Sequence, residues 1–329
     1  VRRQGQRILF VSPESVCQSL LPLLFETAKT GCLDNLIVDE AHIVDQWGAE
    51  FRPYFQILAS LVRSFREVSE HGLRCVLMSA TFNEKSLNLV RELFSEDDTF
   101  FEINGCFLRP EPQYFVKNVD PSSHFDEVID AVINSPKPSI VYVIDPMDAQ
   151  RIHDGLVKIG LTRIGLFTGK TLTAERERLI GIWGTGKLDV MIATSAFGLG
   201  MDKGDVRTVI HAAVPENLDR FYQEVGRGGR DGLACQSILI YSDNQFHNAK
   251  RINDNRLISI ELGLQKWRAM WENGIELPGG KKRIRVATIR PDQQHLTDGN
   301  EEWNWRTLLL MQRAKLILIE LGEPSRLSL

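Results

Sequence analysis

Short apolar runs rich in valine and isoleucine alternate along the chain with longer amphipathic stretches, and this alternation constrains the fold more than any other feature. Each run is bounded by turn-forming or charged residues, and the segments between runs are long enough for a crossover helix. The pattern predicts the α/β class, with parallel sheets covered by helices. The runs that we expect to form strands are Arg7 to Val11, Asn35 to Val38, Arg74 to Met78, Ser139 to Ile144, Val190 to Ala193, Thr208 to His211 and Gln236 to Tyr241.

The chain has 329 residues, which exceeds one ordinary hydrophobic core and predicts two or three domains. A first boundary is expected at residues 104–112, where an Asn-Gly pair and two prolines interrupt the periodicity. After Tyr241 we expect no further strands, and a small, mainly helical region is expected to begin near residue 246. The predicted domains are therefore residues 1–108, 109–245 and 246–329.

Composition excludes several classes of protein. Hydrophobic residues make up 43% and charged residues 25% of the chain, as in globular proteins with buried sheets. No run approaches the roughly eighteen apolar residues of a membrane span, and residues 1–7 lack the apolar core of a secretory signal. We therefore expect a cytoplasmic protein without a membrane partner. The cysteines, which we expect to be reduced, lack zinc-site spacing and are Cys17, Cys32, Cys75, Cys106 and Cys235.

The net charge of −4 means that any nucleic-acid contact must come from local patches rather than from a uniformly basic surface. The clearest patch, Lys281-Lys282-Arg283-Ile284-Arg285, follows the flexible break Pro278-Gly279-Gly280. A last helix is predicted at residues 301–317, as a structural cap or, alternatively, as the start of a winged-helix-like module. Its core-facing positions are expected to be Trp305, Leu308, Leu309 and Ile317.

Two adjacent carboxylates end one predicted strand, in the sequence Leu36-Ile37-Val38-Asp39-Glu40-Ala41-His42. Ligands of open α/β sheets bind at the carboxyl ends of the strands. One carboxylate suits Mg²⁺, which is held through oxygen ligands and water, and the next can orient and deprotonate an attacking water. A strand end with two solvated acids is the alternative interpretation.

Two glycine-rich segments follow later strands. In Ala193-Thr194-Ser195-Ala196-Phe197-Gly198-Leu199-Gly200-Met201-Asp202, backbone amides and the two hydroxyls are suited to gripping a nucleic-acid phosphate. In Gln223-Glu224-Val225-Gly226-Arg227-Gly228-Gly229-Arg230, each guanidinium can pair with phosphate oxygens and neutralise charge on a leaving γ-phosphate. The alternatives are a plain strand-to-helix connector and a solvated Arg-Gly loop.

The order and spacing of these segments resemble the motifs of RecQ-like superfamily 2 helicases. In chain order, the similar segments are Val38 to His42 as motif II of the DEAH type, Ser79-Ala80-Thr81 as motif III, residues 193–206 as motif V and residues 223–232 as motif VI. Gln46-Trp47-Gly48 followed by Phe51-Arg52-Pro53 is similar to the aromatic-rich loop of RecQ-like enzymes. The resemblance covers roughly residues 8 to 245 and implies two RecA-like lobes, the first of them incomplete.

The resemblance also implies roles for individual residues. Asp39 would hold Mg²⁺, partly through water, and Glu40 would be the general base. His42 would link hydrolysis to movement together with the coupling residues, which are expected to be Ser79, Thr81, Gly200 and Asp202. From the second lobe, the residues that close on the γ-phosphate would be Gln223, Arg227 and Arg230, with Arg230 as the arginine finger.

Several further residues are expected to contact DNA. Trp47, Phe51 and Arg52 would sense a single strand, because an aromatic face stacks on any base and an arginine adds phosphate contact. A Trp and a Phe in the core are the alternative. The remaining expected contacts are Thr168 and Gly169 of Phe167-Thr168-Gly169, Thr194 and Ser195 of motif V, and the basic residues Lys281, Lys282 and Arg283.

The chain departs from the family in two ways. No G-x-x-x-x-G-K-[ST] phosphate loop occurs, and the family places that loop ahead of the segment corresponding to Gln6 to Ser15. We therefore expect that the sequence is cut inside the first lobe. The chain by itself is then expected to hydrolyse ATP poorly or not at all. No cysteine follows Cys235, so we expect no zinc site in the C-terminal region. This ending faintly resembles the helicase component of bacterial systems that insert 7-deazaguanine bases into DNA.

The function expected from the sequence is an ATP-dependent DNA helicase or translocase, using ATP and Mg²⁺ and moving 3′ to 5′ on single-stranded or forked DNA, as in DNA repair or modification. Two alternatives stay open. One is a silent DNA-binding scaffold or split motor, because the phosphate loop is absent. The other is an RNA helicase, because DEAH boxes occur across superfamily 2.

Overall fold

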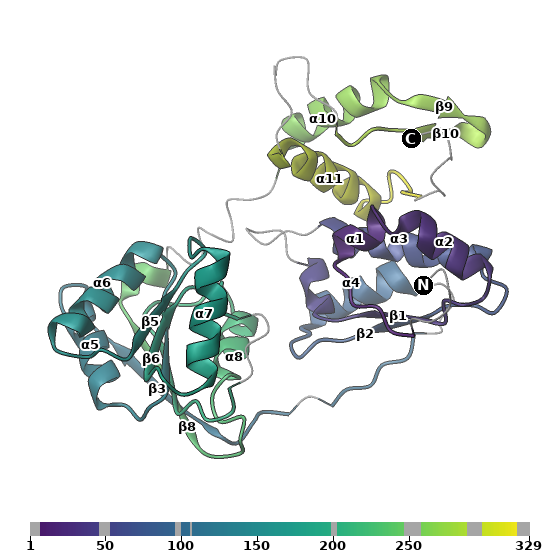
Figure 1. Ribbon diagram of the computed structural model, residues 1–329. Helices are drawn as coiled ribbons and strands as arrows, with labels where there is room; N and C mark the ends of the chain where they lie inside the picture. Colours follow the sequence, from purple (N-terminus) through teal and green to yellow (C-terminus); the bar gives the residue numbers. More distant parts are fainter. Residues whose placement is uncertain are drawn as a thin grey trace. The chain divides into compact units, whose positions relative to one another are not determined.

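The structure is a computed structural model that describes residues 7–45, 53–95, 100–105, 107–198, 203–246, 258–287 and 298–320 (Figure 1). The chain forms two compact units. The first unit combines Val1–Ile103 with Arg256–Leu329, and the second is Asn104–Asn255. This grouping differs from the predicted three-part division, because the C-terminal residues belong with the first unit. The predicted α/β class is confirmed.

The second unit is built on a six-stranded parallel sheet with the order β3-β8-β7-β4-β6-β5. In that order the strands are Pro112–Asn118, Cys235–Tyr241, Thr208–His211, Ser139–Tyr142, Val190–Ala193 and Ile164–Phe167. Every residue of β4, β6 and β7 is buried. Their continuous apolar character fits a parallel sheet that is covered on both faces.

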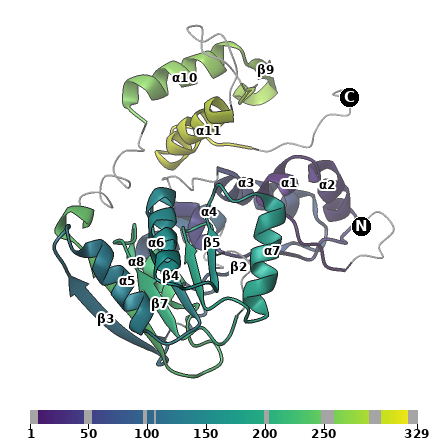
Figure 2. The ribbon, with the colours of Figure 1, turned by 60° about the vertical axis from the view of Figure 1, so that its left-hand side comes forward.

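Helices cover the two faces of this sheet, as Figure 2 shows. Helices α5 (His124–Asn134) and α6 (Pro146–Lys158) pack Val128 and Leu156 against Val141 of β4. Helix α7 (Thr173–Gly184) packs Leu179 and Trp183 against the opposite face of the sheet. Successive strand residues point to opposite faces, so each strand contributes to both cores. Helix α8 (Leu218–Val225) precedes β8.

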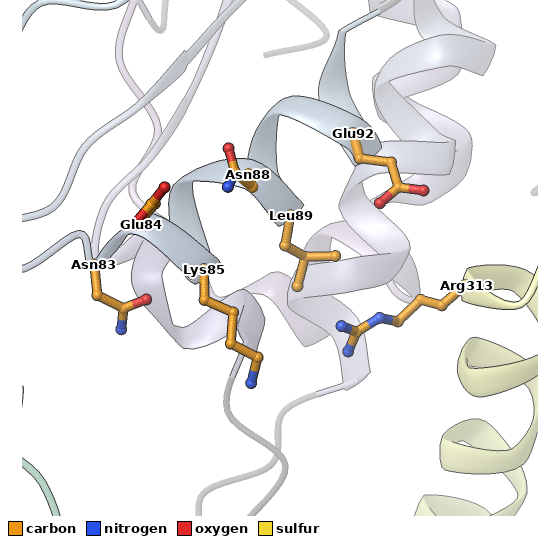
Figure 3. Close-up of a pocket in the computed structure, with 7 residues that line it drawn as sticks. All are labelled: Asn83, Glu84, Lys85, Asn88, Leu89, Glu92 and Arg313. Carbon is orange, nitrogen blue, oxygen red and sulfur yellow. The ribbon is translucent and has the colours of Figure 1, made fainter.

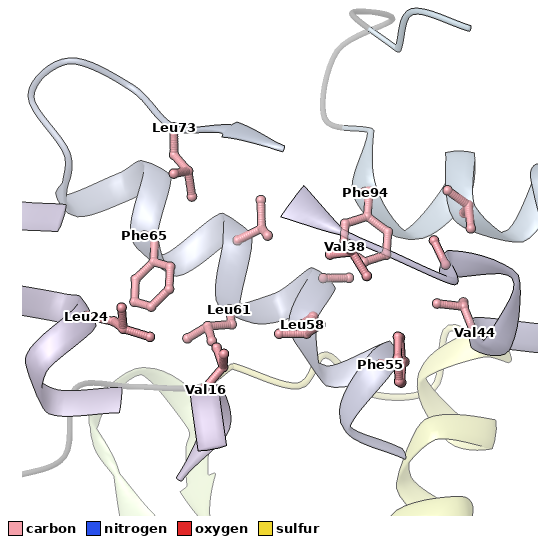
Figure 4. Packing of buried hydrophobic residues seen from close by; sticks show 14 of the residues in the cluster. Val16, Leu24, Val38, Val44, Phe55, Leu58, Leu61, Phe65, Leu73 and Phe94 are labelled. Atoms are coloured by element: carbon pink, nitrogen blue, oxygen red, sulfur yellow. The ribbon is translucent and has the colours of Figure 1, made fainter. Parts of the chain in front are cut away.

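The first unit begins with α1 (Pro13–Cys17) and α2 (Leu21–Lys29), and then forms a two-stranded parallel sheet. Its strands are β1 (Asn35–Val38) and β2 (Arg74–Leu77), with Val38 opposite Leu77. Between and after them lie η1 (Ala41–Asp45), α3 (Pro53–Val68) and α4 (Glu84–Phe94). Helix α3 is central because its side chains Leu58, Leu61 and Phe65 pack with residues of the strands and the other helices (Figure 4).

Two cysteines of this core are held as thiols. Burial, with the nearby carboxylate of Glu14, raises the pKa of Cys17 to about 12. Burial also raises the pKa of Cys75 to about 11. A raised pKa keeps the sulfur protonated and unreactive at neutral pH, in line with the expectation that the cysteines are reduced.

The prediction of a strand at Arg7 to Val11 is wrong, because this segment has no strand neighbour among the described residues. A strand requires partners for its backbone groups, whatever its composition. The side chain of Phe10 is 93% exposed, and Ile37 of β1 is 61% exposed. The described part of this sheet therefore leaves apolar surface uncovered, although parallel sheets are normally buried on both faces.

The expectation of no strand after Tyr241 is also wrong. Strands β9 (Ile275–Leu277) and β10 (Lys281–Arg283) form an antiparallel hairpin, joined by η2 (Pro278–Gly280). Gly279 and Gly280 have φ of +79° and +72°. Residues with a side chain rarely adopt such angles, so the two glycines make the turn possible. The apparent break in the sequence is therefore a hairpin turn.

The hairpin lies between α10 (Ile260–Glu272) and α11 (Asp298–Arg313) in the chain. Leu308 and Leu309 of α11 are buried, as predicted, and Leu309 packs against Ile57 of α3. The ring of Trp305 lies 6.4 Å from that of Tyr54, so α11 packs against helix α3 of the same unit. No helix in the described parts of the chain is long and apolar enough to span a membrane.

Candidate functional site

The acidic pair Asp39 and Glu40 follows β1 directly. The backbone N–H of Glu40 donates to Oδ1 of Asp39 at 2.9 Å. Glu40 has φ of +52°, a conformation that is uncommon for a residue with a side chain. The turn is fixed from β2, because the N–H of Ala41 donates to the carbonyl of Met78 at 2.9 Å. Strained backbone of this kind occurs at functional sites, where surrounding contacts impose it.

His42 connects this turn to Ser79, which follows β2. Its Nδ1 lies 2.9 Å from Oγ of Ser79 and 3.3 Å from Oε2 of Glu40. The same Ser79 hydroxyl accepts the backbone N–H of Thr81 at 3.0 Å. The structure thus brings together four residues that the sequence assigned to catalysis and coupling. Their individual roles stay predictions.

Asp39 fits the predicted role of holding Mg²⁺. Its carboxylate is exposed at the carboxyl end of β1. In the described parts of the chain, no group of three or more His, Cys, Asp or Glu side chains could hold a metal ion. Mg²⁺ commonly binds through one or two carboxylates, water and substrate phosphates, so a single exposed carboxylate suits it. The expected lack of a zinc site stays a prediction.

In the second unit, Thr168 and Thr194 follow the neighbouring strands β5 and β6. The N–H of Thr194 donates to the carbonyl of Phe167 at 3.1 Å, which places the two loops side by side. Both threonines are buried, whereas Gly169 and Ser195 are exposed. These four residues, which the sequence assigned to DNA contact, therefore lie at the same edge of the sheet, where ligands of parallel sheets bind.

Arg227 lies at this edge as well. Its Nη2 is 2.8 Å from the position that a Cβ on Gly198 would occupy, so glycine allows the guanidinium to approach the motif V loop. The guanidinium also lies near Tyr142: burial raises the pKa of that hydroxyl, and the charge of Arg227 lowers it. The Nε of Arg227 is buried without a hydrogen-bond partner among the described residues. A buried donor without a partner favours an anionic ligand.

Arg109 holds the loop that carries Arg230, and sequence reasoning missed it. Its Nη1 donates to the carbonyl of Gly226 at 2.9 Å, and its Nη2 to that of Gly229 at 2.7 Å. Arg230 itself is exposed, with its Nε donating to the same Gly226 carbonyl at 3.1 Å. Arg109 stands shortly before β3, a strand that the sequence analysis did not recognise. Finding that strand would have pointed to it.

A second missed group ties α8 to the sheet. Nε2 of His211, at the end of β7, lies 3.0 Å from Oε2 of Glu224, and both side chains are buried. The other carboxylate oxygen of Glu224 accepts from Nε of Arg220 at 3.0 Å. The His211 ring stacks on Tyr142 with 5.6 Å between ring centres. This network fixes the helix on which Gln223 lies.

Not all predicted residues can be placed. Trp47, Phe51, Arg52, Gly200 and Asp202 lie outside the described residues. The basic residues Lys281, Lys282 and Arg283 form β10. The first-unit group around Asp39 and the second-unit group around Arg227 belong to different compact units.

A groove of about 610 Å³ lies between α4 and the end of α11 in the first unit. Figure 3 shows Arg313 extending from α11 toward the side chains of α4. Its charged lining mixes acids and bases, namely Glu84, Glu92, Lys85 and Arg313. The groove contains none of the predicted site residues. Because its lining carries both positive and negative charges, it favours neither an anionic nor a cationic ligand.

Gly229→Ala tests how tightly the arginine loop is held. Gly229 has φ of +60°, and an added Cβ would lie 2.5 Å from the carbonyl oxygen of Leu233. We expect a loss of roughly 1–3 kcal/mol in the free energy of unfolding from the backbone strain, and more from the clash. Gly232→Ala is the matched control, because Gly232 has φ of +80° with nothing within 4 Å. Urea unfolding measures the free energy of unfolding of both variants. Equal losses in the two would show that the arginine loop can move away from the added Cβ at no cost.

Residues 124–232 match the family described as helicase conserved C-terminal domain. ATP-dependent DNA helicase Q1 of Rattus norvegicus is 32% identical over 266 residues, which are 79% of this chain and 41% of that protein. The chain is therefore similar to the RecQ-like superfamily 2 helicases over most of its length. RecQ-like DNA helicase blm-1 of Caenorhabditis elegans is 30% identical over 253 residues, which are 75% of this chain and 24% of that protein.

The RecQ-like chain spans less than half the length of these two relatives. Solved structures support the fold. Dbp5 of S. cerevisiae bound to RNA and ADP BeF3 has a TM-score of 0.52 at 18% identity, covering 70% of this chain and 61% of that chain. Mss116p bound to ssRNA and AMP-PNP also has a TM-score of 0.52, at 16% identity, covering 76% of this chain and 55% of that chain. The likeness to RecA-like helicase lobes is thereby confirmed.

Proposed function

We propose that this chain is the motor part of an ATP-dependent DNA helicase or translocase, moving 3′ to 5′ on single-stranded or forked DNA. The observation that carries the proposal is the linked turn in which His42 joins Glu40 to Ser79. Through this link, a movement of the Glu40 carboxylate during hydrolysis would be passed on to Ser79 and the segment that follows β2. The names of the similar curated proteins, which are DNA helicases, support DNA over RNA.

Bound ATP with Mg²⁺ would supply the phosphoanhydride bond whose hydrolysis drives movement. Asp39 would hold the metal, and Glu40 would orient the attacking water and take its proton. Arg227 and Arg230 would neutralise the charge that develops on the phosphate oxygens, with Gln223 beside them. The backbone of the DNA strand would lie against the loops that begin at Thr168 and Thr194.

Hydrolysis also needs a phosphate cradle, and the sequence contains no G-x-x-x-x-G-K-[ST] loop. We propose that a segment outside this sequence supplies the cradle together with further strands of the first sheet. The exposed apolar side chains of Ile37 and Phe10 support this, since added strands and helices would cover them. Without such a segment, the chain would act as a DNA-binding scaffold.

Strand displacement tests the proposal. The chain, extended to include a phosphate loop, is incubated with ATP, Mg²⁺ and duplexes that carry a 3′ tail, a 5′ tail or no tail. We expect release from the 3′-tailed DNA duplex only. The same duplexes made of RNA serve as competitors. Equal or better competition by RNA would favour an RNA helicase, and release from the 5′-tailed duplex would refute the polarity.

A further inference from the structure

Strand β10 separates the basic residues of the C-terminal patch onto two faces. Lys281 and Arg283 are exposed, Lys282 is turned inward, and Arg285 just beyond the strand is exposed again. This alternation follows from the two-residue period of an extended chain. Two residues advance by about 6.6 Å, so the row of Lys281, Arg283 and Arg285 is about 13 Å long. One cation of the predicted patch, Lys282, is therefore not part of the row.

Lys282 has a structural position instead. Its Nζ lies 4.6 Å from the centre of the Trp271 ring on α10, in a cation–π arrangement. The side chain is only 11% exposed, and its Nζ is 3.8 Å from Oε1 of Glu276 on β9. These contacts hold the hairpin on α10, so a solvent anion has little access to this charge.

The exposed cations differ in their acidic neighbours. Nζ of Lys281 donates to Oε2 of Glu320 at 2.6 Å, and this hydrogen bond, with the charge of Glu67, raises the pKa of Lys281. Arg283 has no carboxylate within ion-pair distance among the described residues. An anion reaching the row would meet the open guanidinium of Arg283 and would compete with Glu320 for Lys281.

We propose that Lys281, Arg283 and Arg285 hold the phosphate backbone of DNA, and that Glu320 weakens this contact by occupying Lys281. The row rests on the proposed DNA function and adds to it a second backbone site, on the C-terminal hairpin. A strand rising about 3.4 Å per nucleotide presents several phosphates along a row of this length. The ligand chemistry is a phosphate diester backbone, from either a single strand or a duplex.

The salt dependence of binding tests the row directly, and needs no nucleotide. Fluorescence anisotropy of a labelled thirty-nucleotide oligo-dT, and of a duplex of the same length, is measured with the full chain from low to moderate salt. Each lost phosphate contact lowers the slope of log K against log salt by about 0.7 for a single strand and about 0.9 for a duplex. We expect Arg283→Gln to lower the slope by the amount of one phosphate contact, measured on whichever of the two oligonucleotides binds more tightly. Glu320→Gln should tighten binding several-fold at low salt.

Lys282→Met is the matched control, because it removes one charge from the same strand and keeps the apolar stem over Trp271. It should leave the slope unchanged. A drop equal to that of Arg283→Gln would overturn the division of the patch into two faces. Unchanged slopes in Arg283→Gln, or no binding of either oligonucleotide at low salt, would overturn the row. Because ATP is absent, these outcomes are separate from those of the strand-displacement experiment.

Discussion

Replacing Arg230 by alanine is expected to lower DNA-stimulated ATP hydrolysis by about 10³- to 10⁵-fold, in a form of the protein that hydrolyses ATP. The reason is that a guanidinium neutralises charge that develops only in the transition state. Binding of nucleotide should change little. Arg230→Lys should also be strongly impaired, because an ammonium cannot form the forked pair of hydrogen bonds with phosphate oxygens.

The control for Arg230 is Arg178→Ala. Arg178 is an exposed arginine of the same unit, paired with Glu175 on α7 at 2.6 Å. An exposed pair of this kind contributes little to stability, so its loss should leave both hydrolysis and folding nearly unchanged. Steady-state hydrolysis and binding of a fluorescent nucleotide are measured for all three variants. Near-normal turnover in Arg230→Ala would refute its role as the arginine finger.

Trp183→Ala is expected to destabilise the second unit by about 3–5 kcal/mol. Trp183 is 1% exposed and is among the largest fully buried side chains. Its ring centre lies 6.2 Å from that of Phe197 and 5.5 Å from Nζ of Lys203. Because Phe197 precedes Gly198, the cavity would also loosen the loop against which Arg227 lies.

Ile180→Ala is the matched control on the same helix, since Ile180 is 37% exposed. Its loss should change the free energy of unfolding by less than about 1 kcal/mol. Denaturant unfolding followed by circular dichroism compares the two variants. Similar midpoints for both would mean that α7 does not pack on the sheet as described.

The sequence predicted the buried strands well, because burial on both faces leaves a continuous apolar run. The bounds predicted for the buried strands β6 and β7 match those of the structure, and so do those of β1, which is apolar but partly exposed. Strand β5 was missed because Ile-Gly-Leu-Phe contains a glycine, and β3 because Pro112 opens it and polar residues flank its apolar centre. The three-residue strands of the hairpin are too short for any period to show.

The candidate site divides in the same way. Asp39, Glu40, Thr194 and Arg227 could be predicted as site residues because each follows a recognisable strand or lies in a local motif. Arg109 was missed because the loop that it holds is 117 to 120 residues away in the chain. Such pairs depend on tertiary packing, which leaves no local pattern. The opposite faces of Lys282 and Arg283 also required the strand to be known.

The most direct test of the motor assignment is DNA-stimulated ATP hydrolysis by this chain, alone and extended to include a phosphate loop. We expect stimulated activity in the extended form only. We also expect Glu40→Gln to lower that activity by about 10²- to 10⁴-fold, because the general base is lost. Stimulated activity of the extended form that survives Glu40→Gln would refute the role of Glu40 as the general base. Glu40-dependent activity of the chain alone would refute the need for an added phosphate loop.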